Sequence, residues 1–147
     1  MRFFQSQQET GVRWITYKEP EISSNIIWGL TCENVVNGDV WVATPLFGVD
    51  RFTPSAADPR YGSWRNYTAT DVPAFRSNQI YAVSMNIVDY SIWVSSTFSL
   101  VVLLDDVRGW RSYTPSPQYD YTVISLATDL SNTIWMGRRE GASKLDR

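Results

Sequence analysis

Histidine is absent from the 147 residues, and cysteine occurs only once, as Cys32. Without histidine, the chain cannot form a Ser/His or Cys/His nucleophile pair, nor a metal site with histidine ligands. With one cysteine it cannot form an intrachain disulfide, so cysteine usage leaves the redox compartment open. These absences remove two common kinds of catalytic centre from consideration.

Long hydrophobic runs and charge of one sign are also missing. No apolar run approaches the roughly 20 residues of a membrane-spanning helix, and the start, MRFFQSQQET, lacks the apolar core of a signal peptide. The 13 basic and 15 acidic residues give a net charge of −2, with no basic stripe to neutralise phosphates. We therefore expect neither a membrane nor a nucleic acid as partner. A complete chain of this kind is expected in the cytoplasm.

Aromatic side chains are abundant instead. The sequence has seven Trp and eight Tyr, and hydrophobic residues make up 44% of it, so intrinsic disorder is not expected. A chain of 147 residues is long enough for one domain with its own core. We therefore treat residues 1–147 as a single unit.

Two aromatic motifs recur along the chain. W-x-x-Y begins at Trp14, Trp64 and Trp110, with spacings of 50 and 46 residues that are typical of propeller blades. The other motif is a β-branched residue, a Trp and an apolar residue. It occurs as Val40-Trp41-Val42, Ile92-Trp93-Val94 and Ile134-Trp135-Met136.

Each repeat unit reads as four short strands: the W-x-x-Y strand, an apolar strand, the Trp-centred strand and a last strand. The units cover about residues 12–53, 63–104 and 109–146. The apolar strand carries a small residue at one matching position (Gly29, Ala82, Ser125), as expected where strands crowd around a central axis. No segment has a helical period, so we predict twelve strands and an all-β fold, with the three Trp-centred strands largely buried.

The order of these motifs resembles the two-component regulator propeller repeat. Asn25-Ile-Ile27-Trp-Gly29-Leu30 and Asn78-Gln-Ile80-Tyr-Ala82-Val83 fit its apolar strand, and Trp41-Val-Ala-Thr44 fits the strand that follows. The third unit departs from the pattern with Tyr121 in place of Asn, and the second has Asn86 in place of Asp. The resemblance extends from about Trp14 to Leu145 and implies a β-propeller with three four-stranded blades.

The resemblance also implies a class of function. Such repeats form extracytoplasmic sensor regions of signalling proteins, which often recognise carbohydrate fragments, and a fragment of such a sensor would be extracytoplasmic. The chain carries no kinase or DNA-binding part, so we expect a non-enzymatic module for ligand or partner binding, or for assembly. The alternative is a propeller lyase or hydrolase with an acid and a base on the axial face. Related propellers include both lyases and scaffolds, and fold alone does not decide between them.

Ligands of a propeller usually meet the face where the inner strands begin, which we call the axial face. The loops expected there carry aromatic, amide and charged side chains suited to a polar, ring-shaped ligand such as a carbohydrate. The candidate ligand-binding residues are Asn25, Phe47, Arg76, Asn78, Phe98, Tyr121, Arg138, Arg139 and Glu140. Ordinary loops at the axis would account for the same composition.

Other candidates have simpler explanations. Six of the seven Trp sit at repeat positions and are expected to pack, and Trp28 is expected in the core as well. The turn acids Glu33, Asp89 and Asp129 come from separate units and are not spaced as one Ca²⁺ cage, so we expect them to be solvated. Asp120 and Glu140 lie on the axial face, but no motif marks them as an acid/base pair. We expect no enzyme activity, no cofactor and no metal.

Three blades make an open arc, whereas propellers typically close with four to eight. Two chains would supply six blades, and three chains would supply nine. The chain also begins with an outer strand that has no blade, Val12 to Tyr17 with the motif Trp14-Ile-Thr-Tyr17, and ends on Ala142 to Leu145, which has no outer neighbour. We therefore expect a homodimer in which these two strands pair, closing a six-bladed propeller.

Overall fold

The structure is a computed structural model that describes residues 14–35, 38–113 and 122–145. Its regular structure is almost entirely short β-strands, rich in the β-branched and aromatic residues that favour a pleated, half-buried surface. One 3₁₀ turn, η1 (Pro73–Phe75), interrupts them. The prediction of an all-β fold is confirmed, and within each sheet consecutive strands are antiparallel neighbours.

Three antiparallel sheets follow one another along the chain, and we refer to them as the first, second and third sheet. In each, strand order in space follows strand order in the sequence. The first sheet consists of β1 (Gly29–Cys32), β2 (Val40–Ala43), β3 (Val49–Pro54) and β4 (Gly62–Tyr67). The second consists of β5 (Ile80–Met85), β6 (Ile92–Ser96), β7 (Leu100–Leu103) and β8 (Trp110–Ser112). The third consists of β9 (Val123–Thr128), β10 (Ile134–Arg138) and β11 (Gly141–Leu145).

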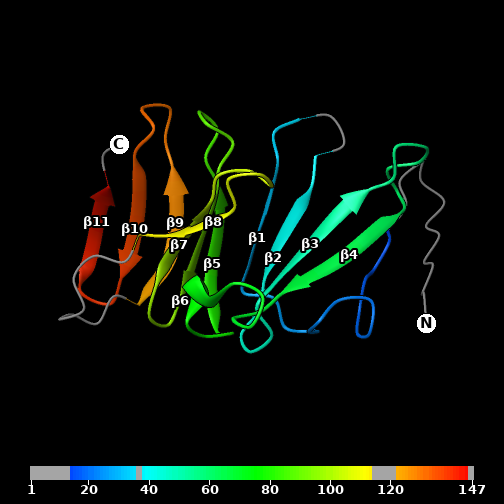
Figure 1. The fold of residues 1–147 in the computed structure, drawn as a ribbon, viewed down its shortest axis with the longest axis horizontal. Helices are drawn as coiled ribbons and strands as arrows, with labels where there is room; N and C mark the ends of the chain where they lie inside the picture. Colours follow the sequence, from blue (N-terminus) through cyan, green and yellow to red (C-terminus); the bar gives the residue numbers. More distant parts are fainter. Residues whose placement is uncertain (1–13, 36–37, 114–121, 146–147) are drawn as a thin grey trace.

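The sheets lie side by side in a row, as the blades of a propeller do (Figure 1). Their first strands are neighbours, with β1 beside β5 and β5 beside β9. Figure 1 shows β11 at one end of the row and β4, with residues 14–17 near it, at the other. The described chain is therefore an open array of propeller-like sheets, with one uncovered sheet face at each end.

Small residues let the first strands approach one another. A Cβ on Gly29 would lie 3.7 Å from the Val83 nitrogen and 3.8 Å from the Ala82 Cα, which is van der Waals contact with β5 itself. The position opposite each small residue on the second strand is also small. The cross-strand pairs are Gly29 with Ala43, Ala82 with Ser95, and Ser125 with Gly137.

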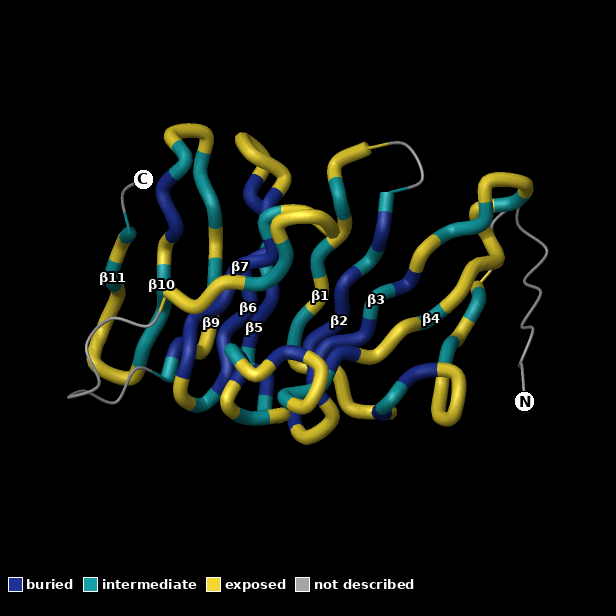
Figure 2. The backbone as a smooth tube through the Cα atoms, in the orientation of Figure 1, coloured by how far each residue is buried: buried dark blue, intermediate teal, exposed yellow. Residues whose placement is uncertain are grey.

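An apolar core lies at each of the two junctions between successive sheets. The larger one lies between the first and second sheets and includes Trp41, Tyr67, Phe75 and Ile80. The smaller one lies between the second and third and includes Trp93 and Ile134. Figure 2 shows burial concentrated in the middle of the row and declining towards β11. Burial of each Trp-centred strand therefore depends on the sheet that follows it.

The third Trp differs from the other two for this reason. Trp41 and Trp93 are fully buried, whereas Trp135 is 44% exposed. The prediction that all three are largely buried is thus wrong for Trp135, because no sheet of the described residues covers the outer face of the third sheet. Trp28, predicted in the core, is also half exposed, although its ring stacks on Tyr81 of the second sheet at 5.2 Å.

The prediction of twelve strands is wrong as well, because the described residues form eleven. The third sheet has three strands rather than four. Residues 14–17, expected as a strand, have no regular structure in the described part of the chain. A strand needs a neighbouring edge, and the open edge at β11 lies at the far end of the row (Figure 1).

Candidate functional site

The predicted axial residues gather only in part. The backbone N–H of Gly48 donates to the Asn78 carbonyl at 2.8 Å, and that of Thr97 donates to the Gln79 carbonyl at 3.2 Å. These bonds hold the β2–β3 loop with Phe47, and the β6–β7 turn with Phe98, against the chain that enters β5. Phe47 and Phe98 are both exposed. The first two sheets therefore present two aromatic side chains and Asn78 at the axial end.

Several other candidate residues have structural bonds. The Glu19 backbone N–H donates to the Asn25 side-chain oxygen at 3.1 Å, and the Asn25 backbone N–H donates to the Glu19 carboxylate at 3.0 Å. The Asn78 side-chain oxygen accepts from the Ala69 backbone N–H at 2.6 Å. Arg76 ends η1 in the left-handed conformation, with φ of 57°. These residues shape the loops, and the Arg76 side chain is exposed above them.

The remaining candidates lie at the third sheet. Arg138 ends β10 and donates to the Ser143 hydroxyl at 3.4 Å, and Arg139 and Glu140 form the exposed β10–β11 turn. No hydrogen bond joins Arg76 to Arg139 or Glu140 among the described residues. Tyr121 and Asp120, both named from the sequence, lie outside the described residues.

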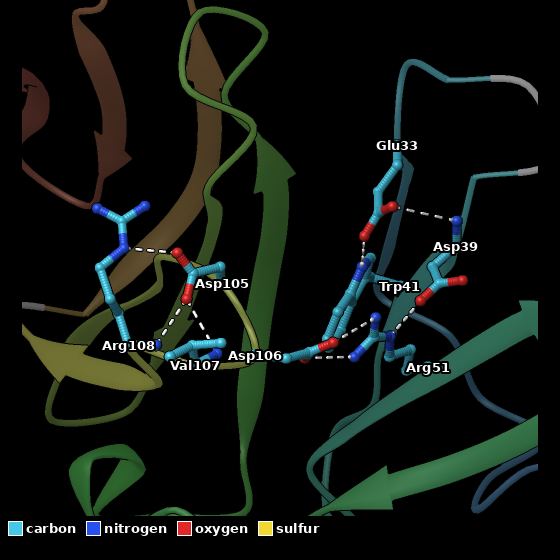
Figure 3. A network of polar contacts seen from close by, with 8 residues as sticks. All are labelled: Glu33, Asp39, Trp41, Arg51, Asp105, Asp106, Val107 and Arg108. Atoms are coloured by element: carbon cyan, nitrogen blue, oxygen red, sulfur yellow. Dashed lines mark hydrogen bonds and ion pairs between the residues drawn. The ribbon is translucent and has the colours of Figure 1, made fainter.

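A polar network at the opposite end of the sheets was not foreseen from the sequence. The Arg51 guanidinium lies over the Trp41 ring, 4.8 Å from its centre. It forms ion pairs with Asp39 of its own sheet and with Asp106 of the second sheet, the latter at 2.8 Å (Figure 3). Burial alone would lower the pKa of Arg51, but hydrogen bonds to Asp106, Tyr67 and Asp39 outweigh it and raise the pKa. Arg51 thus stays charged and ties the first two sheets together.

A hollow of about 370 Å³ opens beside this network. Its walls carry more acidic than basic side chains, including Glu33, Asp89 and Asp105 with Arg51 and Arg108. The Asp105 carboxylate accepts from the backbone N–H of Val107 at 2.9 Å and forms an ion pair with Arg108 (Figure 3). No group of three or more Cys, Asp or Glu among the described residues could hold a metal ion. The bonds of Asp105 thus hold the β7–β8 turn.

The turn acids have a repeated role that the sequence interpretation missed. The Trp41 indole N–H donates to Glu33 at 3.3 Å, and that of Trp135 donates to Asp129 at 2.9 Å. The Trp93 indole N–H donates to the Ser91 hydroxyl at 3.0 Å, and Ser91 in turn donates to Asp89. The bond from Trp135 is the main cause that lowers the pKa of Asp129. These acids, expected only as solvated turn residues, therefore also hold the Trp of their own repeats, Asp89 through Ser91.

Aromatic rings form a triad where the first and second sheets meet. Trp41 and Tyr67 come from the first sheet, and Trp110 from the last strand of the second. The ring centres lie 5.8 Å apart for Trp41 and Tyr67, 5.9 Å for Trp41 and Trp110, and 5.8 Å for Tyr67 and Trp110. Pairs of this kind add about 0.5–1.5 kcal/mol to the effect of burial. The triad therefore ties successive sheets together.

Two incomplete copies of this triad occur elsewhere. Trp93 and Tyr113 of the second sheet lie 5.2 Å apart, as the equivalents of Trp41 and Tyr67. Tyr17 and Trp64 lie 5.3 Å apart in an edge-on contact, as the equivalents of Tyr67 and Trp110. The structure thus contains one complete junction between sheets and two partial ones.

An apolar cavity of about 190 Å³ lies between the second and third sheets. Its walls include Leu100, Tyr113, Val123, Met136 and Leu145. By strand register, the residues equivalent to these at the first junction are Val49, Tyr67, Ile80, Val94 and Leu103. At that junction the same surface belongs to the core against which Trp110 packs. The cavity therefore occupies the place that Trp110 fills one sheet earlier.

Comparison with known proteins supports the fold. No family model matches the sequence, and no curated protein does so. The structure is similar to the extracellular domain of a protein described as a hybrid two-component system, BT3049 from B. thetaiotaomicron. The TM-score is 0.68 at 19% sequence identity, over 91% of this chain and 18% of that chain. The similarity thus concerns the fold alone, and the chain spans about a fifth of its neighbour's length.

Membrane topology adds one finding. Within the described ranges, no helix is both long and apolar enough to cross a bilayer.

Proposed function

We propose that the chain is a non-enzymatic propeller segment that binds a polar, ring-shaped ligand such as a carbohydrate fragment, or a partner, at its axial face. The observation that carries this proposal is the exposed pair Phe47 and Phe98, whose loops are held beside Asn78 by backbone hydrogen bonds. Exposed aromatic faces with adjacent amides and guanidinium groups suit sugar rings. The structural neighbour, an extracellular domain of a two-component system, is consistent with a sensing role.

Catalysis ranks second. A propeller lyase or hydrolase needs an acid and a base within reach of one substrate. Glu140 lies on the exposed β10–β11 turn, and its expected counterpart, Asp120, falls outside the described residues. No described feature therefore favours an acid/base pair over a binding role.

Binding at the axial face is testable with a panel of oligosaccharides titrated by calorimetry. For an oligosaccharide that binds, Phe98→Ala and Arg139→Ala are each expected to weaken affinity about tenfold, since each removes an interaction of roughly 1–2 kcal/mol. Both side chains are exposed, so the unfolding midpoint should not change.

Arg108→Ala is the matched control. Arg108 lies at the β7–β8 turn, in the network at the opposite end of the sheets (Figure 3). Its removal should leave affinity unchanged. Affinity that is insensitive to both axial variants, or a loss with Arg108→Ala alone, would place the site elsewhere.

We further propose that two chains close one six-bladed propeller. Both ends of the row expose apolar groups that neighbouring sheets cover elsewhere in the molecule: Trp135 on the third sheet, and Leu30 on the first. Open strand edges and apolar faces favour association, and six blades lie within the range of closed propellers.

Light scattering in dilute solution should then give about twice the 16.8 kDa mass of one chain. Two copies related by a two-fold axis form a closed assembly without free ends. A folded species at the mass of a single chain would contradict closure by a second copy.

A further inference from the structure

We propose that residues 14–17 of a second copy bind along β11 as the missing fourth strand of the third sheet. In this arrangement Trp14 of that copy enters the cavity between the second and third sheets, and its Tyr17 packs on Trp135. The inference rests on the proposed closure by a second copy and assigns the contacts and the strand register that make it.

The aromatic triads define this arrangement. The complete triad has a Trp and a Tyr from one sheet and a Trp from the last strand of the next. Trp93 and Tyr113 lack that second Trp, and Trp14, which begins the first W-x-x-Y motif, is 71% exposed. Tyr17 and Trp64 lack the Trp of a preceding sheet, and Trp135 is exposed. One interface would complete both triads.

The cavity has the position and character that Trp14 requires. It is the equivalent of the surface on which Trp110 packs, and its walls are mainly apolar. Tyr113, which lines it, is 40% exposed, whereas its equivalent Tyr67 is buried beneath Trp110. Burying an indole ring there would remove apolar surface of both chains from water.

The segment that would bind is already folded as a blade-to-blade connection. Between β4 and β5, the backbone N–H groups of Asp71 and Val72 donate to the Thr68 carbonyl. After residues 14–17, those of Glu21 and Ile22 donate to the Lys18 carbonyl in the same pattern. Ser23 donates from its backbone N–H and hydroxyl to Asp50 at 2.9 and 2.7 Å, which fastens the segment to the first sheet. Residues 14–17 are thus fastened to the end of the first sheet, without a sheet of their own.

The outer face of the third sheet can also accept a neighbouring sheet. The small pair Ala82 and Ser95 of the second sheet faces the third, and the Ser95 hydroxyl donates to the Val123 carbonyl at 2.9 Å. The equivalent pair on the third sheet, Ser125 and Gly137, is small as well. No bulky side chain at this pair prevents the first strand of another sheet from approaching.

The occupant must come from a second molecule. Figure 1 places β11 and residues 14–17 at opposite ends of the row, so these two segments of one chain cannot pair with each other. A blade from a different propeller could use the same face, in which case this chain by itself would remain a monomer.

The two complete sheets predict the register in which residues 14–17 of the second copy pair with β11. Phe52 lies opposite Trp64, and Leu103 lies opposite Trp110. Leu145 is the equivalent of Phe52 and Leu103, because each pairs with the first residue of its Trp-centred strand. Leu145 should therefore lie opposite Trp14 of the second copy, and Ser143 opposite Thr16. The Tyr113 N–H donates to the Leu100 carbonyl, so the adjacent pair, Val101 and Ser112, is a non-hydrogen-bonded pair. Ser143 and Thr16 are the equivalents of Val101 and Ser112.

Engineered disulfides test the register directly. In a Cys32→Ser background, the variant Thr16→Cys/Ser143→Cys should form intermolecular disulfides after treatment with oxidised glutathione, because non-hydrogen-bonded pairs have Cα atoms about 4.5 Å apart. A non-reducing gel should show a single band of two chains. Ile15→Cys/Ser143→Cys is the control: its two thiols would face opposite sides of the sheet and should not cross-link.

A second variant does not depend on disulfide geometry. Trp14→Ala changes a side chain that is exposed in the single chain, so the circular dichroism spectrum should be unaltered. The dimer dissociation constant should rise at least about 30-fold, as for a buried aromatic anchor of an interface.

The outcomes separate this inference from the closure on which it rests. A dimer by light scattering that neither cross-links in the Thr16→Cys/Ser143→Cys variant nor responds to Trp14→Ala would overturn the assigned contacts and leave closure intact. A monomer under all conditions would overturn both. A ladder of larger cross-linked species would show open chains of blades and refute the two-copy ring.

Discussion

Replacing Trp93 with alanine is expected to lower the free energy of unfolding by about 3–5 kcal/mol, the range for a fully buried large aromatic side chain. Trp93 has no exposed surface, packs with Leu100, Val102 and Ile134, and donates its indole N–H to Ser91. The substitution therefore leaves a cavity between the second and third sheets and removes the donor for the Ser91 hydroxyl. Denaturant unfolding followed by far-ultraviolet circular dichroism measures the effect.

Trp135→Ala is the matched comparison. The residue occupies the equivalent place in its strand, but its ring is half exposed and has no sheet over it. In dilute protein the cost should be about 1 kcal/mol, the ordinary value for a single substitution. At concentrations where two copies associate, the cost should grow, because association stabilises the folded state by mass action. Equal costs for both substitutions in dilute protein would contradict the burial difference.

The pair also shows what repeat spacing can and cannot predict. The recurrence of Trp41, Trp93 and Trp135 predicted three equivalent strands, since strand identity depends on local pattern. Burial of each Trp depends instead on the next sheet in the row, which the repeat does not contain. The spacing therefore predicted the strand of Trp135 correctly and its exposure wrongly.

Residues 14–17 illustrate the same limit from the other side. Their W-x-x-Y pattern matches β4 and β8, and Tyr17 makes the ring contact with Trp64 that the pattern implies. Strand structure, however, requires hydrogen bonds to a sheet edge, and residues 14–17 pair with no strand in the described part of the chain. A local motif specifies which side chains pack, whereas pairing requires a partner.

The candidate site was only partly predictable for a similar reason. Placing Phe47, Asn78 and Phe98 at one end follows from the order of strands and loops in each repeat. The ion pair of Arg51 with Asp106 joins residues 55 positions apart in different repeats, and no motif marks it. One signal was available: Arg51 lies in the strand that pairs with the Trp41 strand, directly opposite Trp41. An Arg across from a Trp is well placed to cover its ring.

Gly48→Ala is expected to lower the free energy of unfolding by about 3 kcal/mol or more, through strain, a steric clash and a lost hydrogen bond. Gly48 has φ of +88°, which residues with a side chain rarely adopt. The Cβ of an alanine there would lie 2.1 Å from the Tyr67 carbonyl oxygen. Backbone atoms cannot rotate away as a flexible side chain can, so β3 or β4 must shift. The same shift would stretch the 2.8 Å bond from the Gly48 N–H to the Asn78 carbonyl.

Gly109→Ala separates the clash from the backbone strain. Gly109 also has a positive φ, of +69°, but an added Cβ there would meet nothing within 4 Å. Gly109→Ala should lower the free energy of unfolding by about 1 kcal/mol, the cost of placing a residue with a Cβ in the left-handed conformation. The Gly48 N–H bonds the Asn78 carbonyl and so fixes the loop that carries Phe47. Substitution of Gly48 should therefore also reduce binding at the axial face, whereas Gly109→Ala should not. Equal stability of the two variants in denaturant would contradict the close approach of the β2–β3 loop to Tyr67, and with it the placement of Phe47 at the axial end.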